Sequence, residues 1–330
     1  MAKNASIASP ILMDHTVIPV GFIITIENIF SFLVLYRCTR LNYQIRILSI
    51  NLCISDLLTG LSLCFPLKFY HFSESCGFKK YVNSFFVTIS LLTVTVMDID
   101  RCLAIHFGIK YYIYISKRFL ISVCTVCWFI SFLITYMVYF DFTGYYGVHC
   151  EPIFSTPKNS ITICASSFLL LSILSNVIMF IYLVRKIRKR YLYIKDKNVL
   201  TRSTGRYTEQ GIVIKKLLAI TGCFILCATP YIITTFPVLD YSTPFGKKVH
   251  TITALTILSN SAINPVLYVW RFREARYQLR RSLCFWNQSY VEKLQLRHNE
   301  ENASYVINLG PAILPENHIL TKSNVLCQTC

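Results

Sequence analysis

Charge is scarce in this 330-residue sequence, because only 15% of the residues are charged and only 16 are acidic. Hydrophobic residues make up 54% of the chain, and the mean hydropathy is +0.49. A single water-soluble core cannot use so much apolar surface, since globular domains carry about 25% charged residues. The composition therefore excludes an ordinary soluble domain and predicts that lipid surrounds much of the chain.

The residue groupings on which many enzymes depend are also missing. The seven His residues are scattered, and no two of them stand at metal-ligand spacing on one helix. The 11 Gly residues are dispersed and form no phosphate-binding loop, and there is no nucleophile elbow. We therefore expect that the protein is not an enzyme.

Seven apolar runs are each long enough to cross a bilayer core, which needs about 20 helical residues. They cover residues 17–38, 47–70, 81–105, 119–140, 160–184, 214–239 and 249–270. Strands of a membrane barrel would be shorter and would alternate strictly, and this pattern does not occur. Because unpaired backbone groups are too costly in lipid, each run should be a helix. The predicted fold is an all-α integral membrane bundle of seven transmembrane helices, with residues 17–270 as its domain.

Most of the 33 Lys and Arg residues lie between these runs, the others lie near the ends of the runs, and together they gather on one side of the predicted membrane. If the N-terminus is outside, only seven of them face the outside, and the other 26 face the cytoplasm. The bias predicts a multi-pass protein of the cell membrane with an extracellular N-terminus and a cytoplasmic C-terminus. Since the basic residues follow the topology, the net charge of +17 does not indicate a nucleic-acid partner.

The two ends of the chain have different expected roles. Residues 1–16 should form a short extracellular segment without a cleavable leader, with a glycosylation sequon at Asn4. So short a segment cannot fold into a ligand-capturing domain, so a ligand should bind in the bundle or on its loops. Residues 271–284 have the spacing of a basic amphipathic helix that lies on membrane lipid. The polar residues 285–330 should be a disordered cytoplasmic tail.

Polar residues within the apolar runs are costly in lipid and are functional candidates for that reason. In chain order they are Asn51 and Asp56, then Asp100-Arg101-Cys102, then Trp128, then Phe224 to Pro230, and last Asn264-Pro265-Val-Leu-Tyr268. Over about residues 17–284 this set resembles the signature of rhodopsin-like G-protein-coupled receptors. The resemblance implies a receptor that converts binding of an extracellular ligand into activation of a heterotrimeric G protein, by outward movement of helix 6. A peptide, a lipid or another small molecule could be the ligand.

The resemblance gives Asp100 and Arg101 the role of a switch at the inner end of helix 3. At rest the acid holds the guanidinium, which engages the G protein when it is released. The alternative is a plain ion pair at a helix end. Two departures are notable: Cys102 replaces the usual Tyr, and Asp98 adds an acid about 60° from Arg101 around the helix. Our hypothesis is that Asp98 over-stabilises the resting pair.

Further coupling and switch residues follow from the same resemblance. They are Ile109 in the second cytoplasmic loop, Tyr182, Pro230, Asn264, Pro265 and Tyr268. The two prolines should kink their helices and let them swing. Gly108 stands where relatives commonly have Pro, and Ala228 stands where a Trp normally senses ligand. The altered trigger makes a receptor-like protein that no longer signals one alternative.

Asp56 should lie at mid-membrane depth, where similar receptors surround this acid and a sodium ion with Ser and Asn. The matching positions are Ser90, Asn260, Ser261 and Asn264. A buried carboxylate without partners would take up a proton instead. Because hard cations prefer oxygen ligands, an allosteric sodium ion is the one bound group expected here. The alternative is a hydrogen-bonded polar cluster without an ion.

The resemblance also implies sites near the two membrane faces. Cys76 and Cys150 would form a disulfide on the oxidising extracellular side. The candidates for the ligand pocket are Asn83, Phe224 and Ala228. Asn83 takes the place of the Asp with which amine receptors bind a cation, so a simple amine is disfavoured. Cys284 follows the amphipathic helix and is a candidate for palmitoylation, with a free thiol as the alternative.

A seven-helix transporter or channel is the other alternative, in which Asp56 and Asn264 would line a permeation path. Transporters usually show paired polar interruptions in both halves of the chain. In this sequence the motif residues concentrate instead at the cytoplasmic ends of helices 3, 5, 6 and 7. The pattern therefore favours a receptor.

Overall fold

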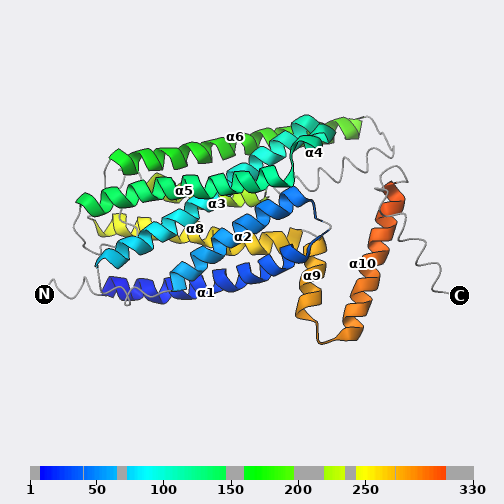
Figure 1. Cartoon of the computed structure of the whole chain (residues 1–330), viewed down its shortest axis with the longest axis horizontal. Coiled ribbons are helices and arrows are strands. Elements are labelled where there is room, and N and C mark those ends of the chain that lie inside the picture. Colours follow the sequence, from blue (N-terminus) through cyan, green and yellow to red (C-terminus); the bar gives the residue numbers. More distant parts are fainter. Residues whose placement is uncertain are drawn as a thin grey trace. The chain divides into compact units, whose positions relative to one another are not determined.

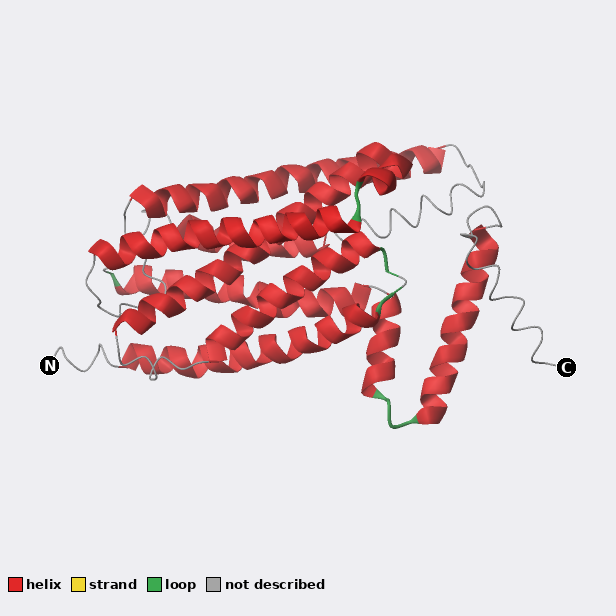
Figure 2. Ribbon diagram, viewed as in Figure 1, coloured by secondary structure: helices red, strands yellow, loops and turns green. Residues whose placement is uncertain are grey.

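The structure is a computed structural model that describes residues 8–39, 41–64, 73–145, 160–196, 219–234, 243–271 and 273–309. All regular secondary structure within these ranges is helical (Figure 2). The chain divides into two compact units, Met1–Arg185 with Lys216–Leu279 and Lys186–Lys215 with Arg280–Cys330, which are taken separately below. The first unit holds the helical bundle.

Long helices follow one another in the order that the apolar runs predict. They are α1 (Ala8–Arg37), α2 (Tyr43–Cys64), α3 (Ser73–Phe107), α5 (Lys117–Tyr145), α6 (Ser160–Asp196), the Ala219–Thr234 helix and α8 (Pro244–Arg271). The predicted all-α membrane bundle of seven helices is confirmed. Several helices extend beyond the predicted spans, because polar residues at their ends continue the same backbone into water. Of the described helices, five are long and apolar enough to cross a membrane, and Ala219–Thr234 is a shorter apolar helix.

The helices of the bundle run side by side (Figure 1). α1 packs against α2 and α8, while α2 also packs against α3, α5 and α8, and α3 packs against α5. Large apolar side chains are exposed on the outward faces of the helices, as lipid contact requires. Examples are Phe22 and Ile26 on α1, Phe129 and Met137 on α5, and Leu171 and Ile178 on α6.

Two glycines allow α1 and α2 to approach closely. A Cβ atom at Gly60 would lie 2.6 Å from Thr25 Oγ1 and 2.8 Å from Thr25 N, and one at Gly21 would lie 2.8 Å from Leu63 Cβ. Small residues at such crossings let backbones pack tightly where there is no hydrophobic force between helices in lipid. The α1–α2 contact thus depends on the absence of a side chain at both positions.

Between α3 and α5 lie the short helices η2 (Gly108–Lys110) and α4 (Tyr111–Tyr114), and α9 (Arg273–Leu283) follows α8. α9 covers most of the predicted amphipathic segment, with Ala275 and Tyr277 buried and Arg280 and Arg281 exposed.

The tail differs from the prediction of disorder for residues 285–330. Helix α10 spans Gln288–Leu309, and Asn287 caps it, since the backbone N of Tyr290 donates to Asn287 Oδ1 over 3.0 Å. The stretch from Glu292 to Arg297 consists of strong helix formers, which explains the helix despite its polar composition. Residues 310–330 lie outside the described part.

A substitution at Gly60 tests the α1–α2 contact. Gly60→Ala forces its Cβ into Thr25, and such overpacking costs about 1–3 kcal/mol. We expect a lower apparent melting temperature of the purified protein in detergent. Gly222→Ala is the matched control, because a Cβ there lies at an ordinary 3.5 Å from the ring of Phe180. Equal melting temperatures for the two variants would contradict the packing argument.

Candidate functional site

Asp56 is completely buried on α2, and hydroxyl and amide groups from two other helices surround it. Ser90 Oγ of α3 and Ser261 Oγ of α8 donate to Asp56 Oδ1 over 3.1 and 2.7 Å. Asn264 Nδ2 of α8 donates to Asp56 Oδ2 over 2.8 Å. The structure thus brings Ser90, Ser261 and Asn264, three of the four residues that the sequence grouped around this acid, into contact with it, and the contacts join α2, α3 and α8.

Two amide carbonyl oxygens of α8, one of them on the Asn264 that binds Asp56, have spare hydrogen-bonding capacity. Asn264 Oδ1 and Asn260 Oδ1 are buried and have no hydrogen-bond partner among the described residues. Asn260 lies one turn before Asn264 on α8 and is 2% exposed. These oxygens, the carboxylate of Asp56 and the hydroxyls of Ser90 and Ser261 form the all-oxygen set that a hard cation prefers.

A second polar group joins α2, α3 and α5. Trp128 Nε1 of α5 donates to Asn51 Oδ1 over 3.0 Å, and Asn51 Nδ2 donates to Thr93 Oγ1 of α3 over 2.8 Å. Asn51 and Trp128 were recognised as motif residues in the sequence, whereas Thr93 was not. These bonds give both motif residues a structural role, which is to fix three helices in register.

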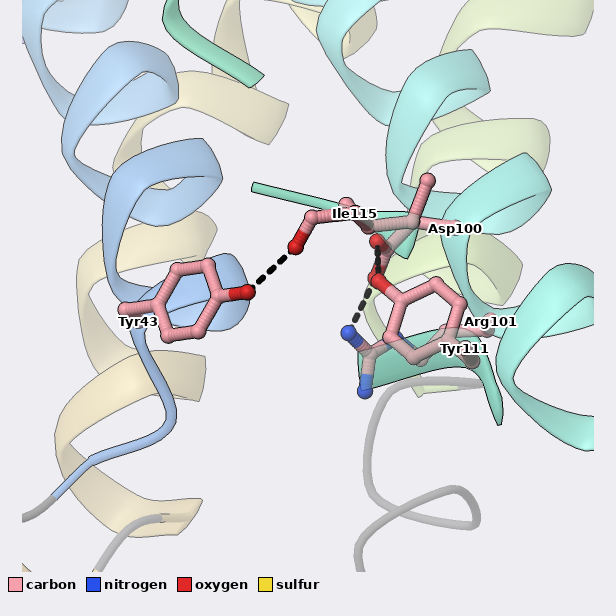
Figure 3. A network of polar contacts seen from close by, with 5 residues as sticks. All are labelled: Tyr43, Asp100, Arg101, Tyr111 and Ile115. Atoms are coloured by element: carbon pink, nitrogen blue, oxygen red, sulfur yellow. Dashed lines mark hydrogen bonds and ion pairs between the residues drawn. The ribbon is translucent and has the colours of Figure 1, made fainter. Parts of the chain in front are cut away.

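The C-terminal part of α3 carries a buried ion pair between Arg101 and Asp100 (Figure 3). Both residues are buried, and the hydroxyl of Tyr111 from α4 donates to the other carboxylate oxygen of Asp100. Tyr43 at the start of α2 donates to the backbone carbonyl of Ile115 just after α4. The loop between α3 and α5 is therefore bound to both α3 and α2.

Gly108 explains why this loop lacks the usual Pro. Its φ is +57°, in the left-handed region that glycine adopts without strain and that the ring of proline excludes. The left-handed residue turns the chain from the end of α3 into η2. The glycine therefore permits the turn that brings Tyr111 to Asp100.

Asp98 does not support the hypothesis that it strengthens the Asp100–Arg101 pair. Its Oδ1 accepts a hydrogen bond of 2.6 Å from Thr221 Oγ1 of the Ala219–Thr234 helix. Although Asp98 lies only about 60° from Arg101 around α3, its described hydrogen bond goes to another helix, and the described ion pair of Arg101 is with Asp100. The extra acid thus joins α3 to the Ala219–Thr234 helix.

The remaining switch candidates lie on the expected helices. Pro230 is in the Ala219–Thr234 helix, Pro265 is inside α8, and Tyr182 is half-buried on α6. The side chains of Ile109 in η2 and Tyr268 in α8 lie outside what the structure describes, so their predicted roles stay predictions.

The three candidates for the ligand pocket are all buried. Phe224 and Ala228 lie one turn apart on the Ala219–Thr234 helix and are 2% and 0% exposed. Asn83 on α3 is engaged by α2, because the hydroxyl of Ser62 donates to its Oδ1. Asn83 therefore serves the α2–α3 contact, and its role toward a ligand stays a prediction.

The sites near the membrane faces are covered only in part. Asn4, Cys150 and the side chain of Cys76 lie outside the described residues. Cys284 is half-buried in the turn after α9. The predicted disulfide, glycosylation and palmitoylation thus stay predictions.

Sequence reasoning missed the hydroxyl groups that complete these contacts. Thr93, Tyr111 and Thr221 each bind a motif residue or an acid from another helix. Hydroxyl residues are common in membrane helices, so only the packing of the helices reveals which of them have such a partner. Their one sequence signal is a position at the same membrane depth as a buried acid or amide.

Residues 27–268 match the model of the seven-transmembrane receptors of the rhodopsin family. The chain belongs to this family. As a rhodopsin-family receptor it is a G-protein-coupled receptor and a multi-pass membrane protein, and a transporter is not favoured. Members of the family are receptors rather than enzymes, and their general partners are G proteins and extracellular ligands.

Curated relatives of this receptor carry corresponding names. G-protein coupled receptor 65 of Homo sapiens is 24% identical over 310 residues, which cover 83% of this chain and 88% of that receptor. G-protein coupled receptor 12 of Rattus norvegicus is 26% identical over 275 residues, covering 80% and 78%. Proto-oncogene Mas of Mus musculus is 24% identical over 320 residues, covering 92% and 93%.

A substitution at Tyr111 tests the contact between the loop and Asp100. Tyr111→Phe removes a hydrogen bond to a buried carboxylate, which is worth about 2 kcal/mol. We expect a lower apparent melting temperature of the purified receptor. Tyr114→Phe is the control from the same short helix, since Tyr114 is 73% exposed. If the Tyr111→Phe and Tyr114→Phe receptors had the same melting temperature, the contact would be refuted.

Proposed function

We propose that this receptor binds its ligand in the extracellular half of the bundle and activates a heterotrimeric G protein at the cytoplasmic end of α3. The N-terminus is then extracellular and the C-terminus cytoplasmic, as the distribution of Lys and Arg favours. Cys76 and Cys150 would tie the second extracellular loop to α3, Asn4 would carry a glycan, and Cys284 a palmitoyl chain. The class of the ligand is a peptide, a lipid or another small molecule.

The observation that carries the proposal is the buried Arg101, held by Asp100 and placed beside the Tyr111 loop. A guanidinium cannot lose its charge, so it needs an acidic partner whenever it is buried. Release from Asp100 frees the planar cation to bind carbonyl or carboxylate groups of a G protein. An ion pair with no role beyond the helix end could lie at the surface, as most such pairs do, where it would contribute little to stability. The burial of this pair therefore favours a further role.

Release requires space at the inner end of the bundle. Pro230 interrupts the helix hydrogen bonds of the Ala219–Thr234 helix, so the segment before it can swing outward about this kink. Ligand and G protein both favour the open arrangement, and each therefore strengthens the binding of the other. Asn264, Pro265 and Tyr268 on α8 and Tyr182 on α6 would exchange partners as the cleft opens, and Ile109 would enter the G protein.

We also propose that Asp56, Ser90, Asn260, Ser261 and Asn264 hold a sodium ion in the resting receptor. Support comes from the buried carbonyl oxygens of Asn260 and Asn264, which have no hydrogen-bond partner among the described residues. When bound, the ion supplies a positive charge that neutralises Asp56. These residues span α2, α3 and α8, so their contraction around a cation favours the closed bundle.

Removal of the Arg101 side chain tests the coupling role. We expect Arg101→Ala to abolish G-protein activation, measured as separation of Gα from Gβγ by energy transfer in cells with matched surface expression. Arg118→Ala is the control, because Arg118 is an exposed cytoplasmic cation at the start of α5. Indistinguishable traces for the wild type and Arg101→Ala, both without ligand and across a ligand panel, would argue that the chain does not signal.

Replacement of sodium tests the ion site. Ligand-independent activation should rise when NaCl is exchanged for N-methylglucamine chloride, because the closed state loses its cation. Asp56→Asn removes the charge that attracts the ion and should abolish this response. Ser259→Ala is the control, since its hydroxyl is exposed and bonds to Leu255 of its own helix. A sodium response that persists in Asp56→Asn would place the ion elsewhere.

A further inference from the structure

Asp98 is a buried acid that none of the signature motifs accounts for. It lies on α3 and is 3% exposed, and Thr221 of the Ala219–Thr234 helix is likewise 3% exposed. The 2.6 Å bond from Thr221 Oγ1 satisfies Asp98 Oδ1, whereas Asp98 Oδ2 has no hydrogen-bond partner among the described residues. The structure therefore holds a carboxyl group in the bundle by one described hydrogen bond.

Such a placement is costly, because a polar group in a membrane bundle loses its water and needs compensation from protein partners. An apolar residue at this position would pack without this cost. The hydrogen bond to Thr221 offsets part of the cost only while the two helices stay together. Asp98 therefore makes the closed arrangement more favourable than any arrangement in which the Ala219–Thr234 helix has moved away from it.

The position of Thr221 makes the bond sensitive to the proposed movement. Thr221 lies nine residues before Pro230, which corresponds to about 13 Å along the helix. It is therefore on the segment that swings about the proline kink, far enough from it to move away from α3. A hydrogen bond does not survive a displacement of a few ångströms.

Asp98 itself is on a helix that other bonds hold in place. Just before it on α3, Thr93 accepts a hydrogen bond from Asn51 of α2, and Thr95 accepts one of 3.1 Å from Asn176 of α6. The acceptor of the Asp98–Thr221 bond is thus fixed, and the donor is on the moving part. A hydrogen bond with one fixed and one moving partner can form only in the closed state.

We propose that the Asp98–Thr221 hydrogen bond is a latch that holds the Ala219–Thr234 helix closed against α3 in the resting receptor. This latch acts one turn deeper in the membrane than the Asp100–Arg101 pair and joins two helices, whereas that pair lies within α3. Asp98 and Thr221 are therefore positioning residues, which set how often Arg101 is exposed to the G protein. The inference rests on the outward movement proposed above.

The decisive experiment measures the position of the helix without using a G protein. Spin labels on noncanonical amino acids replace the exposed residues Arg118 of α5 and Ala219, and their separation is measured by pulsed electron resonance in purified full-length receptor. Thr221→Val removes the hydroxyl at nearly constant volume. We expect the ratio of long to short separations to rise about tenfold, the effect of one hydrogen bond to a carboxylate.

Several variants separate a latch from a simple loss of stability. Thr221→Ser keeps the hydroxyl and should restore the short separation of the spin labels. Asp98→Asn keeps an acceptor oxygen and should lengthen this separation less than Asp98→Ala does. Thr88→Val is the matched control, because Thr88 is also 3% exposed but donates to Ser84 of its own helix. Adding Asp98→Ala to Thr221→Val should produce little further shift, since both remove the same bond.

In cells, ligand-independent G-protein activation should rise with the long separation for each variant. If Thr221→Val lowers only the melting temperature and leaves the separations unchanged, the bond is merely structural and the latch is refuted. Thr221→Ala makes the same test if the Val variant does not fold. Longer separations without G-protein activation in any variant would support the latch and overturn the proposed function, so the two failures are distinguishable.

Discussion

The interaction on which this structure depends is the hydrogen bond between side chains of different helices in a place where water is absent. Lipid provides no hydrophobic force between helices, so packing and interhelical hydrogen bonds must fix their register. Contacts of this kind follow one another along α3, among them those from Ser90 to Asp56, from Thr93 to Asn51, from Thr95 to Asn176 and from Asp98 to Thr221. Because these residues point in different directions around α3, one helix aligns α2, α6 and the Ala219–Thr234 helix.

The interhelical bonds of the bundle differ in the movements that they would resist. The bonds of Thr93 and Thr95 join α3 to helices without an interior proline near the contact, so they hold a fixed frame. The bonds of Asp56 and Asp98 end on α8 and on the Ala219–Thr234 helix, which contain Pro265 and Pro230. A buried acid thus contacts each of these two proline-containing helices. In the proposed movement, the cost of burying a polar group and a proline break in the backbone coincide at the same two elements.

The sequence was sufficient for the fold because the signals for membrane helices are local. Apolar runs, the position of Lys and Arg, and the order of motifs predicted the seven helices and the family. The partners of single side chains were predictable only where the family motif contained them, as around Asp56. Asp98 was assigned to Arg101 by proximity along the helix, yet it reaches Thr221, because the rotation of one helix against another leaves no trace in either sequence. The helix α10 was missed because its polar composition outweighed the helix propensity of Glu292 to Arg297.

The departures from the family pattern do not argue for a protein that has lost signalling. Gly108 replaces a common proline, but its φ of +57° builds the turn that places Tyr111 on Asp100. The Asp100–Arg101 pair thus gains a partner from the loop although Cys102 stands in place of the motif tyrosine. Ala228 lies about two turns after Thr221 on the Ala219–Thr234 helix, away from the bond to Asp98. The buried Asp100–Arg101 pair and the Asp98–Thr221 bond are therefore both formed beside the altered positions, and these are the contacts on which the proposed coupling depends.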